Sequence, residues 1–281
     1  MMLLVRGCAV LFLLAVGAMP AVSAEPALRV GMIPDAGATQ VSIEEKAPLR
    51  EYLEKVTGQH VELIIPTNYN ATVEALGNGS LDFAYLGGLT YVKAHARYNV
   101  VPLVQRESDR QFHSLFITAA ASPIKSLTDV KGKTFAFGDI NSTSGHPMPY
   151  AALKQAGLVP GSDFSFRYTG SHPATAKAVE GGTADAGALD ESVYQAMLSN
   201  GQLDAAKVRI FYTTQPFIDY VWVARDGVGA ESREKFAAAF LALTEERDAK
   251  VLSILRGSRF QRVSDDRYDE LRQIARELKL F

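Results

Sequence analysis

Three consecutive hydroxyl residues, Ser142, Thr143 and Ser144, lie between an apolar segment and a helical pattern. One hydroxyl there would cap the helix, because Ser and Thr oxygens accept hydrogen bonds from the free N–H groups of a first helical turn. Capping leaves two hydroxyls without a role. A helix N-terminus also carries partial positive charge, so several hydroxyls gathered there, followed by Gly145, suit the binding of an oxyanion. The run alone therefore predicts either a plain cap or an anion site.

Similar polar or glycine residues follow other strand-like segments of the chain. Ligands bind at these strand ends in α/β proteins, where helices begin. The further candidates are Tyr69, Gly88, Thr90, His172, Asp190, Glu191 and, in a later connecting segment, Asp219. Because capping does not require polar groups at so many strand ends, the set favours an anion site.

The main alternative from residue chemistry is a secreted hydrolase in which Ser144 and His172 pair as nucleophile and base. The chain contains no Gly-x-Ser-x-Gly, His-Glu-x-x-His, P-loop or Gly-x-Gly-x-x-Gly motif. Its net charge is -2 and its basic residues are dispersed, so no nucleic-acid surface is expected. We predict a binding protein without a cofactor or a metal and without enzymatic activity.

The first 24 residues have the pattern of a cleavable secretory signal peptide. An arginine precedes an apolar run over 9–16, and Ser23 and Ala24 suit cleavage after Ala24. The run is too short for a membrane span, which argues against a retained anchor. The only cysteine, Cys8, lies in this segment, so the mature chain is expected to contain neither disulfides nor thiolate chemistry.

Short apolar segments alternate with helical patterns in two blocks of the mature chain. Residues 28–34, 60–66 and 81–88 are expected to be strands separated by helices. This βαβαβ pattern is typical of a parallel sheet with helices on its faces. The second block runs over about 126–213, and one more strand is expected at 219–227.

The two blocks of alternating strands and helices, followed by the strand expected at 219–227, predict that the chain crosses twice between two lobes. We place the crossovers around 119–123 and 215–219. The first lobe would then comprise residues 25–119 and 220–281, and the second lobe residues 120–219. A double crossover makes a hinge, and the cleft between the lobes is the expected ligand site.

Five segments also carry a family resemblance. They are Ile33 to Asp35, Asn68 to Ala94, Ser126 to Gly145, Gly170 to Glu191 and Gln215 to Trp222. They include "INSTSG" and, later, "GSHPAT". These segments, spread over nearly all of the mature chain, resemble the periplasmic phosphonate and phosphite binding proteins of ABC transporters, the PhnD-like group.

The resemblance implies a two-lobed α/β periplasmic binding protein of type II with a hinge. In that family pattern, the hydroxyl run and its N–H groups, including that of Gly145, hold the phosphorus oxyanion. His172 faces the same group, and Tyr69 lines the first-lobe side. The resemblance also implies a monomeric periplasmic protein that delivers phosphite or a small phosphonate to the membrane subunits of an ABC permease.

The family pattern is uneven at the residues that would discriminate between ligands. Carboxylates at the positions of Glu191 and Asp219 meet an ammonium in aminophosphonate binders. However, Gly88 stands where those binders more often have Pro, and the segment around it is similar to binders of small inorganic oxyanions. His113 stands where many relatives have Tyr, and we expect it to form part of the wall rather than to hold the ligand. Asp190 is a further possible ligand residue.

Residue chemistry leaves both ligand types open. A carboxylate can pair with a ligand ammonium, and Asp219 could equally accept a hydrogen bond from a P–OH group, which would favour phosphite over sulfate. Another alternative is a receptor for phosphate, arsenite or selenate that serves a membrane sensor. The remaining histidines, His60, His95 and His146, are expected at the surface or as caps.

Overall fold

A computed structural model describes residues 27–34 and 43–281. The expected signal peptide, with Cys8, and Asp35 of the family segment lie outside the described residues. Within the described ranges, no helix is long and apolar enough to cross a membrane.

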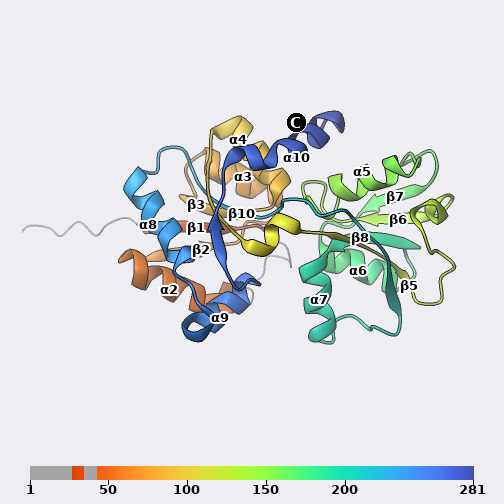
Figure 1. The fold of residues 1–281 in the computed structure, drawn as a ribbon, viewed down its shortest axis with the longest axis horizontal. Helices are drawn as coiled ribbons and strands as arrows, with labels where there is room; N and C mark the ends of the chain where they lie inside the picture. Colours follow the sequence, from red (N-terminus) through yellow and green to blue (C-terminus); the bar gives the residue numbers. More distant parts are fainter. Residues whose placement is uncertain (1–26, 35–42) are drawn as a thin grey trace, which may run out of the picture.

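The protein consists of two α/β lobes that lie side by side along its long axis (Figure 1). The first lobe contains a six-stranded sheet in the order β11-β4-β10-β3-β1-β2, and the second a five-stranded sheet in the order β7-β6-β8-β5-β9. The two-lobed fold of a type II periplasmic binding protein, as the sequence predicts, is therefore confirmed.

The first part of the first lobe follows the expected alternation of strands and helices. Its elements are β1 (Leu28–Met32), α2 (Ala47–Thr57), β2 (Val61–Ile64), α3 (Tyr69–Gly77), β3 (Phe83–Leu86), α4 (Gly88–Tyr98) and β4 (Val101–Arg106). Local sequence explains several ends: Gly58 closes α2 with a φ of 72°, and the Asn68 side chain caps α3 by accepting from the N–H of Ala71.

The chain returns to the first lobe after visiting the second. The returning elements are β10 (Val221–Ala224), α8 (Ala230–Leu241), α9 (Glu245–Leu255), β11 (Phe260–Arg262) and α10 (Asp269–Glu277). The expected parallel pairing holds for β1 with β2 and β3, whereas β10 inserts antiparallel between β3 and β4. The short strand β11 is not among the expected strands. In Figure 1, α3, α4 and α10 lie above this sheet, and α2, α8 and α9 lie on its other side.

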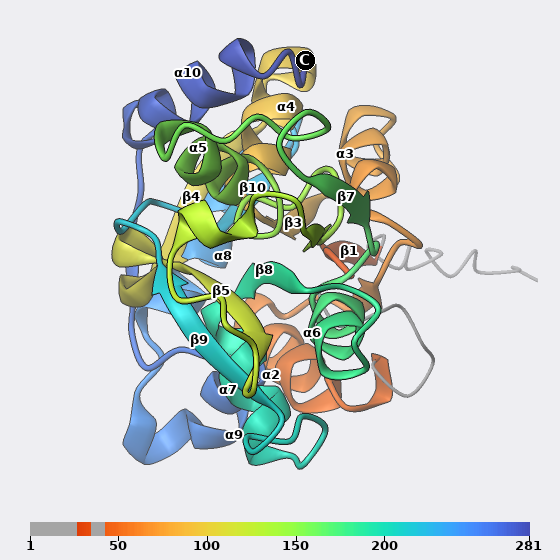
Figure 2. The same cartoon turned by 90° about the vertical axis from the view of Figure 1, so that its right-hand side faces the viewer.

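The second lobe has helices on both faces of its sheet. Its elements are β5 (Ser114–Ala119), β6 (Thr134–Phe137), α5 (Pro147–Gln155), β7 (Ser165–Tyr168), α6 (His172–Glu180), β8 (Ala186–Asp190), α7 (Glu191–Ser199) and β9 (Val208–Thr213). Figure 2 shows α5 on one face and α6 and α7 on the other. Because successive side chains of a strand point to opposite faces, Leu115 and Ile117 pack beneath α6 and α7, whereas Phe116 packs beneath α5.

The first crossover lies earlier than expected. Residues up to 119 are expected in the first lobe, but β5 pairs antiparallel with β8 and β9 of the second sheet. The chain therefore changes lobes between β4 and β5. The error has a physical reason, since an apolar strand pattern shows that a strand exists but does not show which sheet supplies its partners.

The two crossing segments pair with each other. Phe112 and Phe217 exchange two backbone N–H···O bonds, each 2.9 Å long, and the N–H of Asp219 donates to the carbonyl of Asp109 at 3.0 Å. Beside them, the fully buried Asp109 carboxylate accepts from the Arg106 guanidinium. The connection between the lobes is thus a short, hydrogen-bonded two-stranded ribbon.

Candidate functional site

The hydroxyl run lies in a tight loop between β6 and α5, at the junction of the lobes. The N–H of Gly138 donates to the carbonyl of Gly145 at 2.8 Å and closes the loop at its base. The side chains of Ser142, Thr143 and Ser144 are all buried. Burial of three adjacent hydroxyls goes beyond what a helix cap requires.

Ser142 belongs to a hydrogen-bonded chain that continues into α6 and β8. Its Oγ lies 3.1 Å from His172 Nε2 and accepts from the N–H of Gly145 at 3.2 Å. The other ring nitrogen, His172 Nδ1, accepts from the backbone N–H of Asp190 at 3.2 Å. Burial lowers the pKa of His172, so the ring is neutral near pH 7. A neutral ring whose Nδ1 accepts carries its proton on Nε2, and His172 is therefore a donor towards Ser142.

This tautomer bears on the hydrolase alternative. The structure brings His172 to Ser142 rather than to Ser144. A catalytic histidine must take a proton from its serine through Nε2, with a carboxylate or carbonyl accepting from Nδ1–H. Here Nδ1 accepts and Nε2 already carries the proton, so the pair is arranged to donate hydrogen bonds and not to activate a nucleophile.

The first lobe meets the hydroxyl run through the start of α4. The N–H of Leu89 donates to Thr143 Oγ1 at 3.0 Å, and the N–H of Gly88 donates to Asp219 Oδ1 at 2.7 Å. Further along α4, Lys93 Nζ donates to Asn141 Oδ1 at 2.6 Å. These contacts join α4 to the second lobe and to the second crossover, so the lobes meet directly across the site.

Asp219 is buried among polar groups. Burial raises the pKa of Asp219 to about 8, although the Gly88 N–H and the nearby Thr143 hydroxyl act in the opposite direction. At neutral pH its carboxyl group is therefore largely protonated. A protonated carboxyl group can donate a hydrogen bond to an oxyanion and can also accept one from a P–OH group. A proton shared between Asp219 and a phosphorus ligand can therefore reside on the carboxyl group or on the ligand.

Two buried hydroxyl groups near the hydroxyl run, Tyr69 Oη and Ser144 Oγ, have no partner in hydrogen-bonding geometry within residues 27–34 and 43–281. Tyr85 Oη, Ser114 Oγ and Trp222 Nε1 are also buried without such a partner there. Burial raises the pKa of Tyr69, and the nearby Ser142 hydroxyl acts in the opposite direction. Tyr69 comes from the first turn of α3 and Ser144 from the loop before α5. A buried polar group without a partner costs free energy, and a polar ligand between the lobes would satisfy these two "open hydroxyls".

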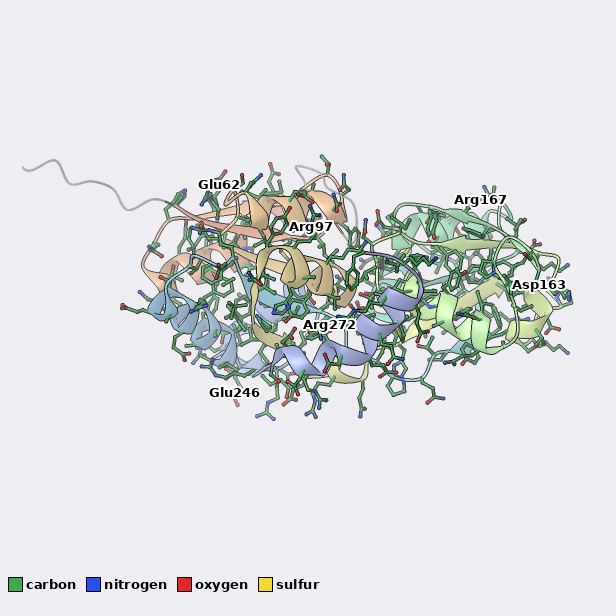
Figure 3. All side chains as sticks on the ribbon, turned by 90° about the horizontal axis from the view of Figure 1, so that it is seen from above. Glu62, Arg97, Asp163, Arg167, Glu246 and Arg272 are labelled. Atoms are coloured by element: carbon green, nitrogen blue, oxygen red, sulfur yellow. The ribbon has the colours of Figure 1, made fainter. Side chains whose placement is uncertain are left out.

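Several helices begin at or just after the candidate residues. α3 begins with Tyr69, α4 with Gly88, α6 with His172 and α7 with Glu191, and α5 begins just after the hydroxyl run. Their free N–H groups and dipoles favour an anion. The exposed charges Glu62, Arg167 and Glu246 lie at the edge of the molecule in Figure 3, away from the junction of the lobes.

The remaining acidic candidates have other partners. Asp190 is fully buried and accepts from the hydroxyls of Tyr220 and Ser192, both at 2.6 Å, and from the N–H of Val193. Glu191 accepts from the backbone N–H of His113, and its other oxygen lies 3.2 Å from the His113 ring. This second pair is partly exposed and lines a surface hollow of about 450 Å³. The structure thus does not bring Glu191 or His113 into the buried hydroxyl cluster.

Three residues near the site are not among the sequence candidates. Lys93 and Asn141 form their contact across the lobes, which no local pattern could show. His146, expected at the surface or as a cap, occupies the N-cap position of α5 without a side-chain capping bond and is 3 % exposed.

Two lobes with a buried, polar junction rich in N–H and O–H donors define a solute-binding protein. Comparison with known proteins identifies the group. The sequence profile of the family described as "ABC transporter, phosphonate, periplasmic substrate-binding protein" matches residues 30–268. The chain belongs to this family, whose members work with ABC permease components and bind their substrates without chemical conversion.

Individual relatives agree with this assignment. The chain is 31% identical over 277 residues to the probable ABC transporter phosphite binding protein PhnD1 of Prochlorococcus marinus (strain MIT 9301), covering 92% of each chain. The structure of that protein in complex with methylphosphonate matches with a TM-score of 0.84 and 29% identity, over 91% of this chain and 99% of the other. The aliphatic sulphonate binding protein SsuA of Escherichia coli matches with a TM-score of 0.63 and 19% identity, over 90% and 88%, which shows the shared fold alone.

Proposed function

We propose that this protein captures phosphite or a small phosphonate between its lobes and delivers it to an ABC permease. The observation that carries the proposal is the pair of open hydroxyls, Tyr69 and Ser144. They lie at a junction of the lobes that is rich in N–H and O–H donors. The relative PhnD1 is described as a phosphite binding protein and has a structure with methylphosphonate, which supports this ligand class.

In the proposed complex, Ser142, Thr143 and Ser144 hold the oxyanion oxygens together with the N–H groups of their loop. His172 keeps its Nε2–H directed at the same loop, and Tyr69 donates from the first lobe. Asp219, protonated at neutral pH, shares its proton with the anion. Closure of the first lobe over the second then removes the ligand from water.

The acidic residues favour a ligand without an ammonium group. An ammonium requires an ionised carboxylate with free acceptor positions. Burial keeps Asp219 largely protonated and Gly88 donates to it, Asp190 accepts three hydrogen bonds, and Glu191 lies with His113 outside the buried hydroxyl cluster. A proline in place of Gly88 would lack the N–H group that now binds Asp219. We infer that aminoalkyl phosphonates bind more weakly than phosphite and methylphosphonate.

We further propose that the mature chain begins at residue 25, after signal-peptide cleavage, and that it acts as a monomer. The two lobes complete the site within one chain, so a second copy is not needed to build it. Mass spectrometry of the exported protein and its sedimentation with and without ligand test these two points.

The test of the ligand is a calorimetric titration with phosphite, methylphosphonate, 2-aminoethylphosphonate, phosphate, arsenite, selenate and sulfate. We expect tight binding of phosphite or methylphosphonate and at least tenfold weaker binding of the aminoalkyl compound. Ser144→Ala should weaken binding tenfold to a hundredfold, since hydrogen bonds to charged groups contribute about 1.5–3 kcal/mol. Its melting temperature should not fall, because Ser144 Oγ has no partner to lose among the described residues.

Ser126→Ala is the matched control in the same lobe. Its hydroxyl bonds only locally, to Thr128 and Asp129, so ligand affinity should not change. Failure of every oxyanion to bind a folded protein would overturn the proposed function. Tightest binding of the aminoalkyl compound would instead overturn the argument on the acidic residues.

A further inference from the structure

His146 has a role in the site that neither its surroundings in sequence nor the family assignment indicates. It is the last residue before α5 and one of two buried histidines near the hydroxyl run. Its Nδ1 lies 2.8 Å from the carbonyl oxygen of Ile140, and its Nε2 lies 2.8 Å from Tyr168 Oη. The ring therefore bridges the two ends of the loop that carries Ser142, Thr143 and Ser144.

The partners of the ring determine its tautomer. A carbonyl oxygen can only accept, so Nδ1 carries a proton and donates to Ile140. Burial lowers the pKa of His146, which keeps the ring neutral near pH 7 and leaves Nε2 as the acceptor for the Tyr168 hydroxyl. This is the opposite tautomer to that of His172, which carries its proton on Nε2.

Packing holds the ring in this orientation. The ring lies edge-to-face against Phe137 of β6, with centroids 5.5 Å apart, and against Tyr168 of β7 at 4.9 Å. On its other side, the ring lies edge-to-face against Tyr150 of α5, with centroids 6.0 Å apart. The ring is thus fixed from the sheet on one side and from the helix on the other.

We propose that His146 is a positioning residue for the oxyanion loop: its Nδ1–H···O bond to Ile140 holds the loop in the shape that places the three hydroxyls before a ligand arrives. The proposal rests on the proposed function of those hydroxyls. Ordering a loop in advance removes part of the entropy cost of binding, so loss of this bond should reduce affinity although His146 never touches the ligand.

Substitutions can separate the two ring nitrogens. In His146→Asn, the side-chain amide nitrogen occupies the place of Nδ1 and can still donate to Ile140. In His146→Gln, the amide reaches the place of Nε2 and keeps only the Tyr168 contact, whereas His146→Leu keeps neither. We expect methylphosphonate affinity to stay within threefold for the Asn variant and to fall at least tenfold for the Gln and Leu variants.

Hydrogen exchange gives a readout that does not require a ligand. In the ligand-free protein, backbone amides of residues 141–145 should exchange faster in the Gln and Leu variants than in the wild type and the Asn variant. Tyr168→Phe removes the second partner from a partly exposed strand, so it should fold and weaken binding about threefold. His60→Asn, at an exposed histidine of the other lobe, is the control and should change neither measurement.

The outcomes distinguish this proposal from the proposed function. If the wild type binds none of the oxyanions, the proposed function fails, while loop exchange still tests His146. Unchanged exchange and affinity in a folded Leu variant would overturn the positioning role. So would an Asn variant as impaired as the Leu variant, because the role would then belong to the packing of the ring and not to its Nδ1–H group.

Discussion

The two lobes contribute to the site in different ways. In the second lobe, Ser142, His172 and the N–H group of Asp190 are hydrogen-bonded to one another, so most of its donors are in place without the first lobe. The first lobe supplies the Tyr69 hydroxyl and the N–H groups that begin α4, which reach the second lobe or its crossover only when the lobes meet. The second lobe thus holds a set of donors that are already hydrogen-bonded to one another, and the first lobe adds its own donors when the lobes close.

The largest expected difference between the lobes is in the response to hydroxyl removal. Ser142→Ala leaves His172 Nε2–H and the Gly145 N–H without their acceptor. We expect a loss of about 1–3 kcal/mol in the free energy of unfolding, together with tenfold to hundredfold weaker binding. Tyr69→Phe, in the first lobe, removes a hydroxyl that lies near Ser142 but has no well-formed hydrogen bond among the described residues, so it should weaken binding about tenfold with little loss of stability.

Thermal unfolding and titration of both variants with methylphosphonate measure these effects. Equal stability losses in the two variants would contradict the expected difference between Ser142, which is hydrogen-bonded within the second lobe, and the open hydroxyl of Tyr69 in the first lobe.

A second expected difference concerns pH, at the crossover where the lobes join. Asp219 has a pKa raised by burial to about 8, so it is largely neutral at pH 7 and ionised at pH 9. The ionised form places a negative charge beside the anion. Affinity for methylphosphonate should therefore fall as pH rises, about tenfold between pH 7 and pH 9, because only the protonated fraction is competent.

Asp219→Asn provides the control for this pH effect. The amide stays neutral, so the ratio of wild-type to variant dissociation constants should rise about tenfold over this interval, while ionisation of the ligand itself cancels in the ratio. A ratio that does not change with pH would show that Asp219 does not titrate beside the ligand.

The smallest expected effect is that of a substitution that weakens closure of the lobes but leaves the hydroxyl cluster unchanged. Lys93→Met removes the hydrogen bond from α4 to Asn141 without touching the hydroxyl cluster. Because this bond is only partly buried, we expect it to contribute about 0.5–1.5 kcal/mol, below the range for buried bonds to charged groups, so affinity should fall roughly threefold to tenfold. Small-angle scattering of the ligand-free protein should show a larger radius of gyration. Lys55→Met, at an exposed lysine of α2, makes the same charge change and should have neither effect.

The sequence was most informative where a local pattern sets the structure. The strands around the site and the run at Ser142 to Ser144 follow from apolar patterns and from the surplus of hydroxyls. Helices α6 and α7 begin at His172 and Glu191, directly after Ser171 and Asp190, whose side chains cap them. These helix starts therefore follow from local cap residues.

Long-range pairing could not be predicted in the same way. The strand β5 reads equally well as part of either sheet until its partners β8 and β9 are known. The sequence offered Ser144 as the partner of His172, but side-chain geometry brings Ser142 to it. Similarly, the sequence around His146 does not show whether its side chain is buried or exposed. These differences depend on which groups meet in three dimensions, a property that residue types constrain only weakly.

The paired ribbon at Phe112 and Phe217 has a consequence for the transport cycle. Two strands joined by hydrogen bonds resist twisting and sliding more than two independent linkers do, so opening is expected to follow a single bending axis. Each closing movement then returns the α4 N-terminus to the same residues of the opposite lobe. The ligand-bound protein would consequently present a single closed conformation to a membrane partner. That partner could distinguish it from the ligand-free form by the relative position of the lobes alone.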